Sequence, residues 1–209
     1  SWILEAQDGL EPAVRQVASG LALDFDSASS LPQVRSHEAV VPRLGVYVPW
    51  ADTDSIGWIR YTLDKQKIPY VYLRDEDIRE GKLGEKVDVI LYGEVRLDLQ
   101  GQIHGIAPTA GPMSFKSSRE FPSLGVPVAS EDITGGIGWN GLANLQEFLN
   151  QGGLMVTLGN ASILPLEGGL VRNVRKAQDQ GVQTHGVELK VRFRIPGHPL
   201  GYGYPEVTS

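Results

Sequence analysis

The chain has 209 residues, no cysteine and a formal net charge of −6 at pH 7, a length that suits one domain, or one domain with a small appendage. The lack of cysteine excludes disulfides, thiol catalysis and cysteine-based zinc sites. The acidic balance disfavours nucleic acid and anionic membranes as partners, because either needs a basic face. No apolar run is long enough for a transmembrane helix, and the N-terminus carries no signal-peptide pattern.

Residues 1–42 form an N-terminal segment with weak patterns. Residues 2–4 are consistent with a strand, and residues 11–13 with the start of a short helix, since proline favours the first helical turn. Residues 21–25 alternate as a strand does. We expect this segment to be the end of a preceding domain, or an extra strand and helix beside a main domain over 43–209.

Residues 43–93 begin with a predicted strand and a predicted helix in succession. The first is a buried strand over 43–48, and Asp52, Thr53 or Asp54 is expected to cap the helix that follows it. The apolar residues of that helix fall near one face: Ile56, Ile59, Tyr61 and Leu63, with Trp58 close by.

Two further strands are predicted over 71–73 and 87–92, separated by an acidic helical turn at 75–77. The acidic side chains there suit a helix N-terminus, and Gly81 ends the turn. A long, irregular insertion rich in glycine, proline and serine follows over 94–134; insertions of this length are usually functional or disordered.

Residues 134–162 repeat the helix–strand pattern. Gly138 or Asn140 is expected to cap a helix that ends at Gly152-Gly153, and residues 154–158 predict a fourth buried strand. The apolar residues of this helix have helical spacing: Leu142, Leu145, Phe148 and Leu149. Alternation over 185–195 predicts an exposed antiparallel strand.

Together these elements predict an α/β domain with a flavodoxin-like parallel sheet, flanked by helices, and an antiparallel addition near 185–195.

The turn Gly159-Asn160-Ala161-Ser162 stands where such folds often carry a nucleophile. Ser162 is the only hydroxyl on it, and a serine needs a base held by a third group. The sequence places none of His104, His185 and His198 beside it, so we interpret the turn as degenerate and expect no catalytic residue in this chain.

Two other patterns are weaker still. His185-Gly186-Val187-Glu188 has an H-x-x-E spacing used for zinc, but positions three apart point to opposite faces of a strand and a third ligand is missing. We therefore expect no metal site. The run Gly135–Gly138 lacks both the dinucleotide fingerprint and the Walker lysine, so we interpret it as a flexible start of a helix and expect no cofactor.

A candidate ligand rim remains, made of Trp50, Asp52, Asp54 and Trp139. Ligands of open α/β sheets bind beyond the carboxyl ends of the strands, where the first three fall. The acidic turn could bind a cation or act in acid–base chemistry, although helix capping explains it more simply. The tryptophans could line a sugar or peptide groove, or belong to the core.

Several short motifs follow one another along the chain. They are Pro49-Trp50 with the acidic turn and Gly57-Trp58, Asp77–Gly81, Asp88–Ile90, Gly135–Gly138, Gln151–Leu154 and His198–Gly203. In this order and spacing they resemble the C-terminal, class I glutamine-amidotransferase-like domain of large bacterial zinc carboxypeptidases of the carboxypeptidase A superfamily. The resemblance covers half to two thirds of the chain, and trehalose-utilisation-type domains share that fold.

The resemblance implies a separate peptidase domain in the same polypeptide, which would hold the zinc, and it implies export to the periplasm or outside the cell. None of that family's zinc ligands or its glutamate base has a counterpart in this sequence. The amidotransferase cysteine is also missing from the turn at 159–162. The resemblance thus implies an accessory domain that packs against the peptidase domain or presents substrate to it.

Two other functions stay open on the sequence alone. One is a binding module for a glycan or peptidoglycan fragment, or a peptide, at the rim of Trp50, Asp52, Asp54 and the insertion at 94–134. The other is a stand-alone serine hydrolase that uses Ser162.

Overall fold

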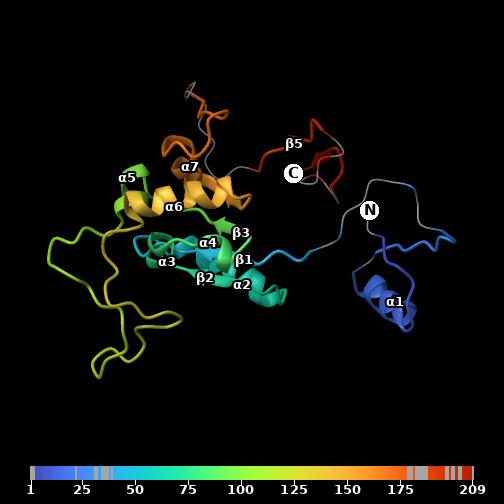
Figure 1. Cartoon of the computed structure of the whole chain (residues 1–209), viewed down its shortest axis with the longest axis horizontal. Helices are drawn as coiled ribbons and strands as arrows, with labels where there is room; N and C mark the ends of the chain where they lie inside the picture. The colour runs from blue at the N-terminus through green and yellow to red at the C-terminus, as the bar shows by residue number, and fades with distance from the viewer. Residues whose placement is uncertain are drawn as a thin grey trace. The chain divides into compact units, whose positions relative to one another are not determined.

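The structure is a computed structural model that describes residues 3–21, 23–30, 33, 38, 40–177, 181, 188–195, 198, 201 and 204–208. The chain divides into two compact units, Ser1–Val41 and Pro42–Ser209. Figure 1 shows the elements of both units. None of the helices in the described ranges combines the length and the hydrophobicity needed to span a bilayer.

The first unit contains helix α1, Leu10–Leu21, and none of its residues is buried. The predicted helix therefore exists and is three turns long. The two predicted strands are wrong in their described parts, since Ile3, Leu4 and residues 23–25 lie outside any strand and Leu21 ends the helix. Local alternation at 21–25 has no partner strand here, and a strand requires one.

The second unit is built on a four-stranded parallel sheet in the order β2-β1-β3-β4. The register pairs Val46 with Tyr72 on one side and with Leu91 on the other, so β1 lies between two neighbours. The predicted parallel sheet of an α/β domain is thus confirmed. Its strands are β1 Leu44–Tyr47, β2 Val71–Leu73, β3 Val89–Tyr92 and β4 Leu154–Thr157.

Helices follow each of these strands and flank the sheet. Helix α5 lies within the segment predicted to be irregular, and it packs against both α6 and α7 (Figure 1). The helices are α2 Asp54–Lys65, α3 Asp75–Glu80, α4 Leu83–Lys86, α5 Leu99–His104, α6 Gly138–Asn150, the 3₁₀ turn η1 Gly159–Ser162 and α7 Ile163–Glu167.

The apolar face of α2 is narrower than predicted. Ile56 and Leu63 are buried and Ile59 packs on the core, but Trp58 and Tyr61 are exposed and stack edge to face on each other. Positions 58 and 61 are one helical turn apart, so the same periodicity that groups them with each other turns them away from Ile56 and Leu63.

Helix α6 has the predicted core positions, with Leu145 and Phe148 buried and Leu142 and Leu149 partly so. Its N-cap is Ile137, which makes no side-chain hydrogen bond, so the capping predicted for Gly138 or Asn140 is wrong.

The predicted glycine stop of α6 is confirmed. Gly152 has φ +97°, its N–H donates to the Leu149 carbonyl at 3.1 Å, and the Gly153 N–H donates to the Phe148 carbonyl at 3.0 Å. This is a Schellman ending.

Strand β4 is an edge strand, not the fully buried strand predicted. Leu154, Val156 and Leu158 are all exposed, while Met155 packs on the core. Near-continuous apolar runs are typical of parallel strands covered on both faces, and here one face of the edge strand lacks such cover among the described residues.

The antiparallel pair near residue 190 joins β5, Val191–Arg192, to β6, Val207–Thr208. It forms a sheet of its own and adds no strand to the parallel sheet. Residues 185–187 of the predicted strand lie outside the described residues.

Gly152 and Gly57 offer a matched test of the backbone. A Cβ at either position would meet no atom within 4 Å, but only Gly152 has a positive φ. We expect Gly152→Ala to lower the free energy of unfolding by about 1–2 kcal/mol through strain. Gly57→Ala should raise it by up to about 1 kcal/mol, because Gly57 is within helix α2. Urea unfolding followed by circular dichroism measures both, and changes of the same sign would contradict the assigned backbone.

Arg43, next to the amino end of β1, forms an ion pair and hydrogen bonds with the segment before β3. Its guanidinium donates to the Asp88 carboxylate at 2.8 and 3.1 Å, and to the carbonyls of Gly84 and Glu85 at 2.7 and 2.6 Å. The hydrogen bonds from the Arg43 side chain and backbone lower the pKa of Asp88 from 3.8 to about 2.

This pKa gives a pH dependence of defined sign. A carboxyl group whose pKa is depressed by folding stabilises the fold above its ordinary pKa of 3.8, and that stabilisation is lost as the pH falls through about 2. We expect Arg43→Gln to return the pKa of Asp88 toward 3.8. The difference in stability between this variant and the parent chain should then disappear as the pH falls from 3.8 to about 2. Carboxyl NMR titration measures the pKa, with Arg15→Gln as the charge-matched control. An ordinary pKa for Asp88 in the parent chain would contradict the pairing.

Candidate functional site

The loops that follow β1 and β3 meet at the carboxyl edge of the sheet, as parallel strands require. Arg96, after β3, joins them: its backbone N–H donates to Asp52 at 2.7 Å and its guanidinium to Asp52 at 3.4 Å and to Asp54. The Asp52 carboxylate also accepts from the Asp54 N–H at 3.4 Å. The N-cap residue Thr53 makes no side-chain capping bond. The acidic turn therefore links the two loops, and Asp52 in addition accepts the first N–H of α2, which the N-cap Thr53 does not do.

Burial raises the pKa of the Asp52 carboxyl, but the hydrogen bonds from Arg96 and Asp54 outweigh it, so the pKa lies below its ordinary value. The side chain of Asp52 is 6% exposed and that of Asp54 is 72% exposed. Arg96 thus supplies the positive charge that a bound cation would bring to this turn.

The turn Gly159–Ser162 forms η1, and a carboxylate from the neighbouring loop covers it. The Glu94 side chain accepts the Asn160 N–H at 2.8 Å, and a Cβ on Gly159, which has φ +54°, would collide with that carboxylate. The positive φ favours glycine here, and a larger residue would also have to displace the Glu94 side chain. The backbone donor that a nucleophile turn would offer to an anion is therefore already bound by the chain itself.

Ser162 is half-buried at the end of η1, and Ala161 beside it is buried. The Ser162 hydroxyl is 2.9 Å from the Thr157 hydroxyl, with which it shares a hydrogen bond. His104 instead meets Trp139 edge to face, with ring centroids 5.7 Å apart. His185 lies outside the described residues. The geometry gives Ser162 a hydroxyl neighbour where a serine nucleophile needs a base.

The acidic run at the start of α3 has separate tasks for its three residues. Asp77 accepts the Arg74 N–H at 2.9 Å, as a residue in the first turn of a helix does. The Glu76 carboxylate accepts the indole N–H of Trp50 at 2.8 and 3.1 Å and the hydroxyl of Ser130. Asp75 is 1% exposed. The predicted favourable charge at a helix N-terminus is thus only part of their role.

Asp75 is bound from β1, since it accepts from the Tyr47 hydroxyl at 2.6 Å and from the Trp50 N–H at 3.3 Å. Burial raises the pKa of the Asp75 carboxyl, and these two hydrogen bonds offset part of the rise. Burial and the nearby Asp75 also raise the pKa of Tyr47. The Tyr92 hydroxyl, at the end of β3, is buried without a hydrogen-bond partner in the structure.

The glycine run before α6 is a close backbone crossing and not merely a flexible start. A Cβ on Gly105 would lie 2.6 Å from the Gly136 Cα, and one on Gly136 would lie 2.5 Å from the Ile103 carbonyl oxygen. Both glycines have positive φ, of +57° and +55°. This crossing holds the end of α5 against the turn that begins α6.

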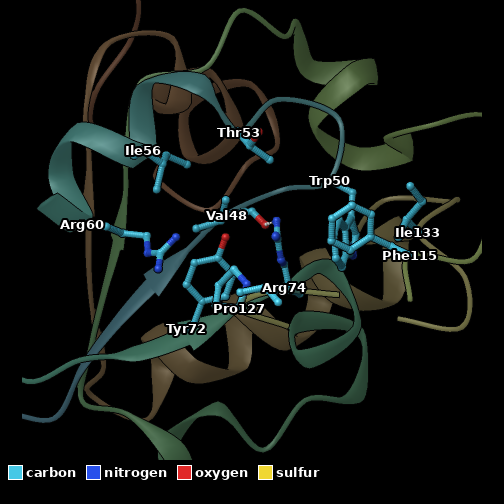
Figure 2. A pocket seen from close by; sticks show the side chains of 12 residues that line it. Val48, Trp50, Thr53, Ile56, Arg60, Tyr72, Arg74, Phe115, Pro127 and Ile133 are labelled. Carbon is cyan, nitrogen blue, oxygen red and sulfur yellow. Dashed lines mark hydrogen bonds between the residues drawn. The ribbon is translucent and has the colours of Figure 1, made fainter. Parts of the chain in front are cut away.

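A pocket of about 350 Å³ opens beside Trp50, at the carboxyl ends of β1 and β2 (Figure 2). Three elements and the loop between α5 and α6 supply its walls. They are Val48, Trp50 and Thr53 after β1, Ile56, Gly57 and Arg60 of α2, Tyr72 and Arg74 at the end of β2, and Phe115, Val126, Pro127 and Ile133 of the loop.

Arg74 occupies the centre of the aromatic wall. Its guanidinium carbon is 3.7 Å from the centroid of the Trp50 ring and 4.6 Å from that of Tyr72, and Arg60 lies 4.6 Å from the Tyr72 centroid. Phe115 meets the Trp50 ring with centroids 5.0 Å apart. Figure 2 shows the two guanidinium groups and the rings gathered around one space.

Sequence reasoning found Trp50 but missed Arg60, Tyr72, Arg74 and Phe115. A signal for two of them exists, because Tyr72 and Arg74 are two residues apart at a strand end and so share a face. No such sequence signal exists for Arg60 and Phe115, because Arg60 is placed by the packing of α2 and Phe115 by a loop that is distant in the sequence.

Of the predicted rim residues, Trp50 alone lines this pocket. Trp50 is 9% exposed and lines the pocket, whereas Trp139 is 60% exposed on α6 and contacts His104. Asp52 and Asp54 do not line the pocket and are joined through Arg96.

Within the described ranges, no group of three or more histidine or acidic side chains is arranged to hold a metal ion.

A scan of protein-family models and searches of curated proteins and of solved structures gave no match for this chain.

Glu94 provides a direct test of the covered turn. We expect Glu94→Ala to remove the acceptor of the Asn160 N–H, to speed hydrogen exchange at that amide, and to cost about 1 kcal/mol of stability, as for the loss of a helix cap. Amide exchange followed by NMR measures the effect at Asn160. Glu120→Ala, an exposed acidic residue of the loop, is the charge-matched control. Unchanged exchange at Asn160 in the Glu94 variant would contradict the assigned contact.

Proposed function

We propose that this chain is a non-catalytic accessory domain of a zinc metallocarboxypeptidase, and that it packs against a separate peptidase domain or presents substrate to it. The observation that supports the proposal most is the covered turn at 159–162. There Glu94 binds the backbone N–H of Asn160, and the Ser162 hydroxyl is hydrogen-bonded to Thr157. A turn in this state offers neither an activated nucleophile nor an open oxyanion site.

The fold we propose is flavodoxin-like, of the class I glutamine-amidotransferase-like kind. The parallel order β2-β1-β3-β4 supports it, because the chain moves outward on both sides of β1 as in doubly wound sheets. The motifs of the family resemblance fall on matching elements: Trp50 follows β1, and Gly152 ends α6. From the same resemblance we propose export of the whole polypeptide.

The other two functions have less support from the geometry. A serine hydrolase would need a base beside Ser162, where Thr157 lies instead. A glycan module would stack a sugar on an open aromatic face, but the guanidinium of Arg74 covers the ring of Trp50.

The first arm of the test uses the 209-residue chain itself. We expect a fluorophosphonate probe to leave Ser162 unlabelled, because its hydroxyl is hydrogen-bonded to the Thr157 hydroxyl, which is not a base. Mass spectrometry of the treated chain locates any label, with Ser162→Ala and Ser55→Ala as matched variants. Labelling that is lost only in Ser162→Ala would overturn the non-catalytic assignment.

The second arm uses the native polypeptide, isolated from its source with an antibody raised against this chain. We expect it to contain zinc and to release C-terminal residues from peptides in a chelator-sensitive way, while the 209-residue chain does neither. A native polypeptide without zinc and without peptidase activity would contradict the proposed accessory role.

A further inference from the structure

The pocket beside Trp50 contains two positive charges without an ion pair among the described residues. Neither Arg60 nor Arg74 lies within 4.0 Å of a carboxylate oxygen in that part of the chain, whereas Arg15, Arg43, Arg96 and Arg192 all do. Arg74 is 5% exposed. Burial of an arginine without an acidic partner is unusual, because removing a charge from water is costly unless the charge is paired.

The hydrogen bonds of Arg74 leave much of its guanidinium unused. One terminal N–H donates to the Val48 carbonyl at 3.1 Å, and Nε is buried with no partner in the structure. A guanidinium carries five N–H donors. The stacking on Trp50 and Tyr72 involves only the faces of the guanidinium, so donors in its plane remain available.

Arg60 has the same spare capacity. Its Nε donates to the Tyr70 hydroxyl at 3.1 Å, and the structure gives its two terminal nitrogens no hydrogen bond. The nearby charge of Arg60 and, above all, burial lower the pKa of Arg74. Two like charges that share one aromatic ring repel each other, and an anion bound between them would relieve this repulsion.

The two carboxylates near Arg74 are hydrogen-bonded to other groups. Asp75 accepts from Tyr47 and from the Trp50 N–H, and Glu76 accepts from the Trp50 indole and from Ser130. Neither forms an ion pair with Arg74 within 4.0 Å. Asp75 and Glu76 act on Arg74 through space and raise its pKa against the effect of burial. Asp64 does the same for Arg60. Neither arginine forms an ion pair with a described residue, so both keep hydrogen-bonding capacity for an anion from outside the chain.

We infer that this pocket is a binding site for a small organic anion, with a carboxylate or phosphate group at Arg60 and Arg74 and a flat apolar body against Phe115 and Ile133. The volume of about 350 Å³ lies at the small end of ligand pockets. Arginine pairs suit the two oxygens of such a head group. The N-terminal residues of α2, Thr53 and Gly57, line the same space and add favourable potential for an anion. This inference does not depend on the accessory role, because it concerns the chain alone.

The test is a titration of the whole chain with three probes of one shape: benzoate, phenyl phosphate and uncharged benzamide. Isothermal calorimetry gives the affinity, and the NMR signal of the Trp50 indole N–H reports the place. We expect saturable binding of benzoate, phenyl phosphate or both, a shift of the Trp50 signal, weaker binding at high salt, and no binding of benzamide. Binding of only one anion would assign the head group as carboxylate or as phosphate.

Variants locate the charge. We expect Arg60→Gln and Arg74→Gln each to weaken anion binding by about 10- to 100-fold, the loss of a charge-assisted hydrogen bond. Arg119→Gln removes the same charge from an exposed loop position and should leave the affinity unchanged. Arg60 is only half-buried, so its variant keeps the test decisive if Arg74→Gln fails to fold. Absence of anion binding at millimolar concentration, equal binding of benzamide, or full affinity in Arg60→Gln would overturn the inference.

Discussion

The parallel pairing of β1 with both β2 and β3 determines how the second unit is arranged. Because the three strands end at one edge, the segments that leave them must pack together there. Trp50 follows β1 and reaches Arg74 at the end of β2 and Glu76 at the start of α3, while Asp52 meets Arg96 after β3. The register of a few short strands thereby decides which side chains form the pocket, the buried carboxylate of Asp75 and the bridged acidic turn.

Most polar side chains at this edge form hydrogen bonds with other groups of the chain. Side chains bound in this way stabilise the fold, whereas those with unused donors can bind a ligand. Asp52, Glu76 and Glu94 each bind donors of the neighbouring loops. The guanidinium groups of Arg60 and Arg74 are the exception in the pocket, since they stack on aromatic rings and keep unused donors. The covered turn and the arginine-lined pocket therefore lie at the same edge of the sheet but differ in what they leave available, because only the pocket offers unused donors.

The sequence was sufficient to predict the parallel sheet, most helix positions and the glycine ending of α6, because these depend on local periodicity and on turn chemistry. It was misleading for β4, where the apolar run at 154–158 looks the same for a central strand and for an edge strand. Of the site, it identified Trp50 and the acidic turn. It did not identify Arg60 or Phe115, whose places depend on the packing of α2 and of a loop distant in the sequence. The roles of Asp52 and Glu94 depend on Arg96 and Asn160, contacts that no spacing encodes.

We infer an anion site at the carboxyl edge of the sheet, formed by Arg60 and Arg74. A crystal structure of the protein soaked with benzoate would test this site without reference to affinity, because it shows where the head group lies. We expect the carboxylate within hydrogen-bond distance of both guanidinium groups, with the ring against Phe115 and Ile133. An empty pocket in which Arg74 forms an ion pair with Glu76 or Asp75 would contradict the account, because the charge would then be neutralised within the chain.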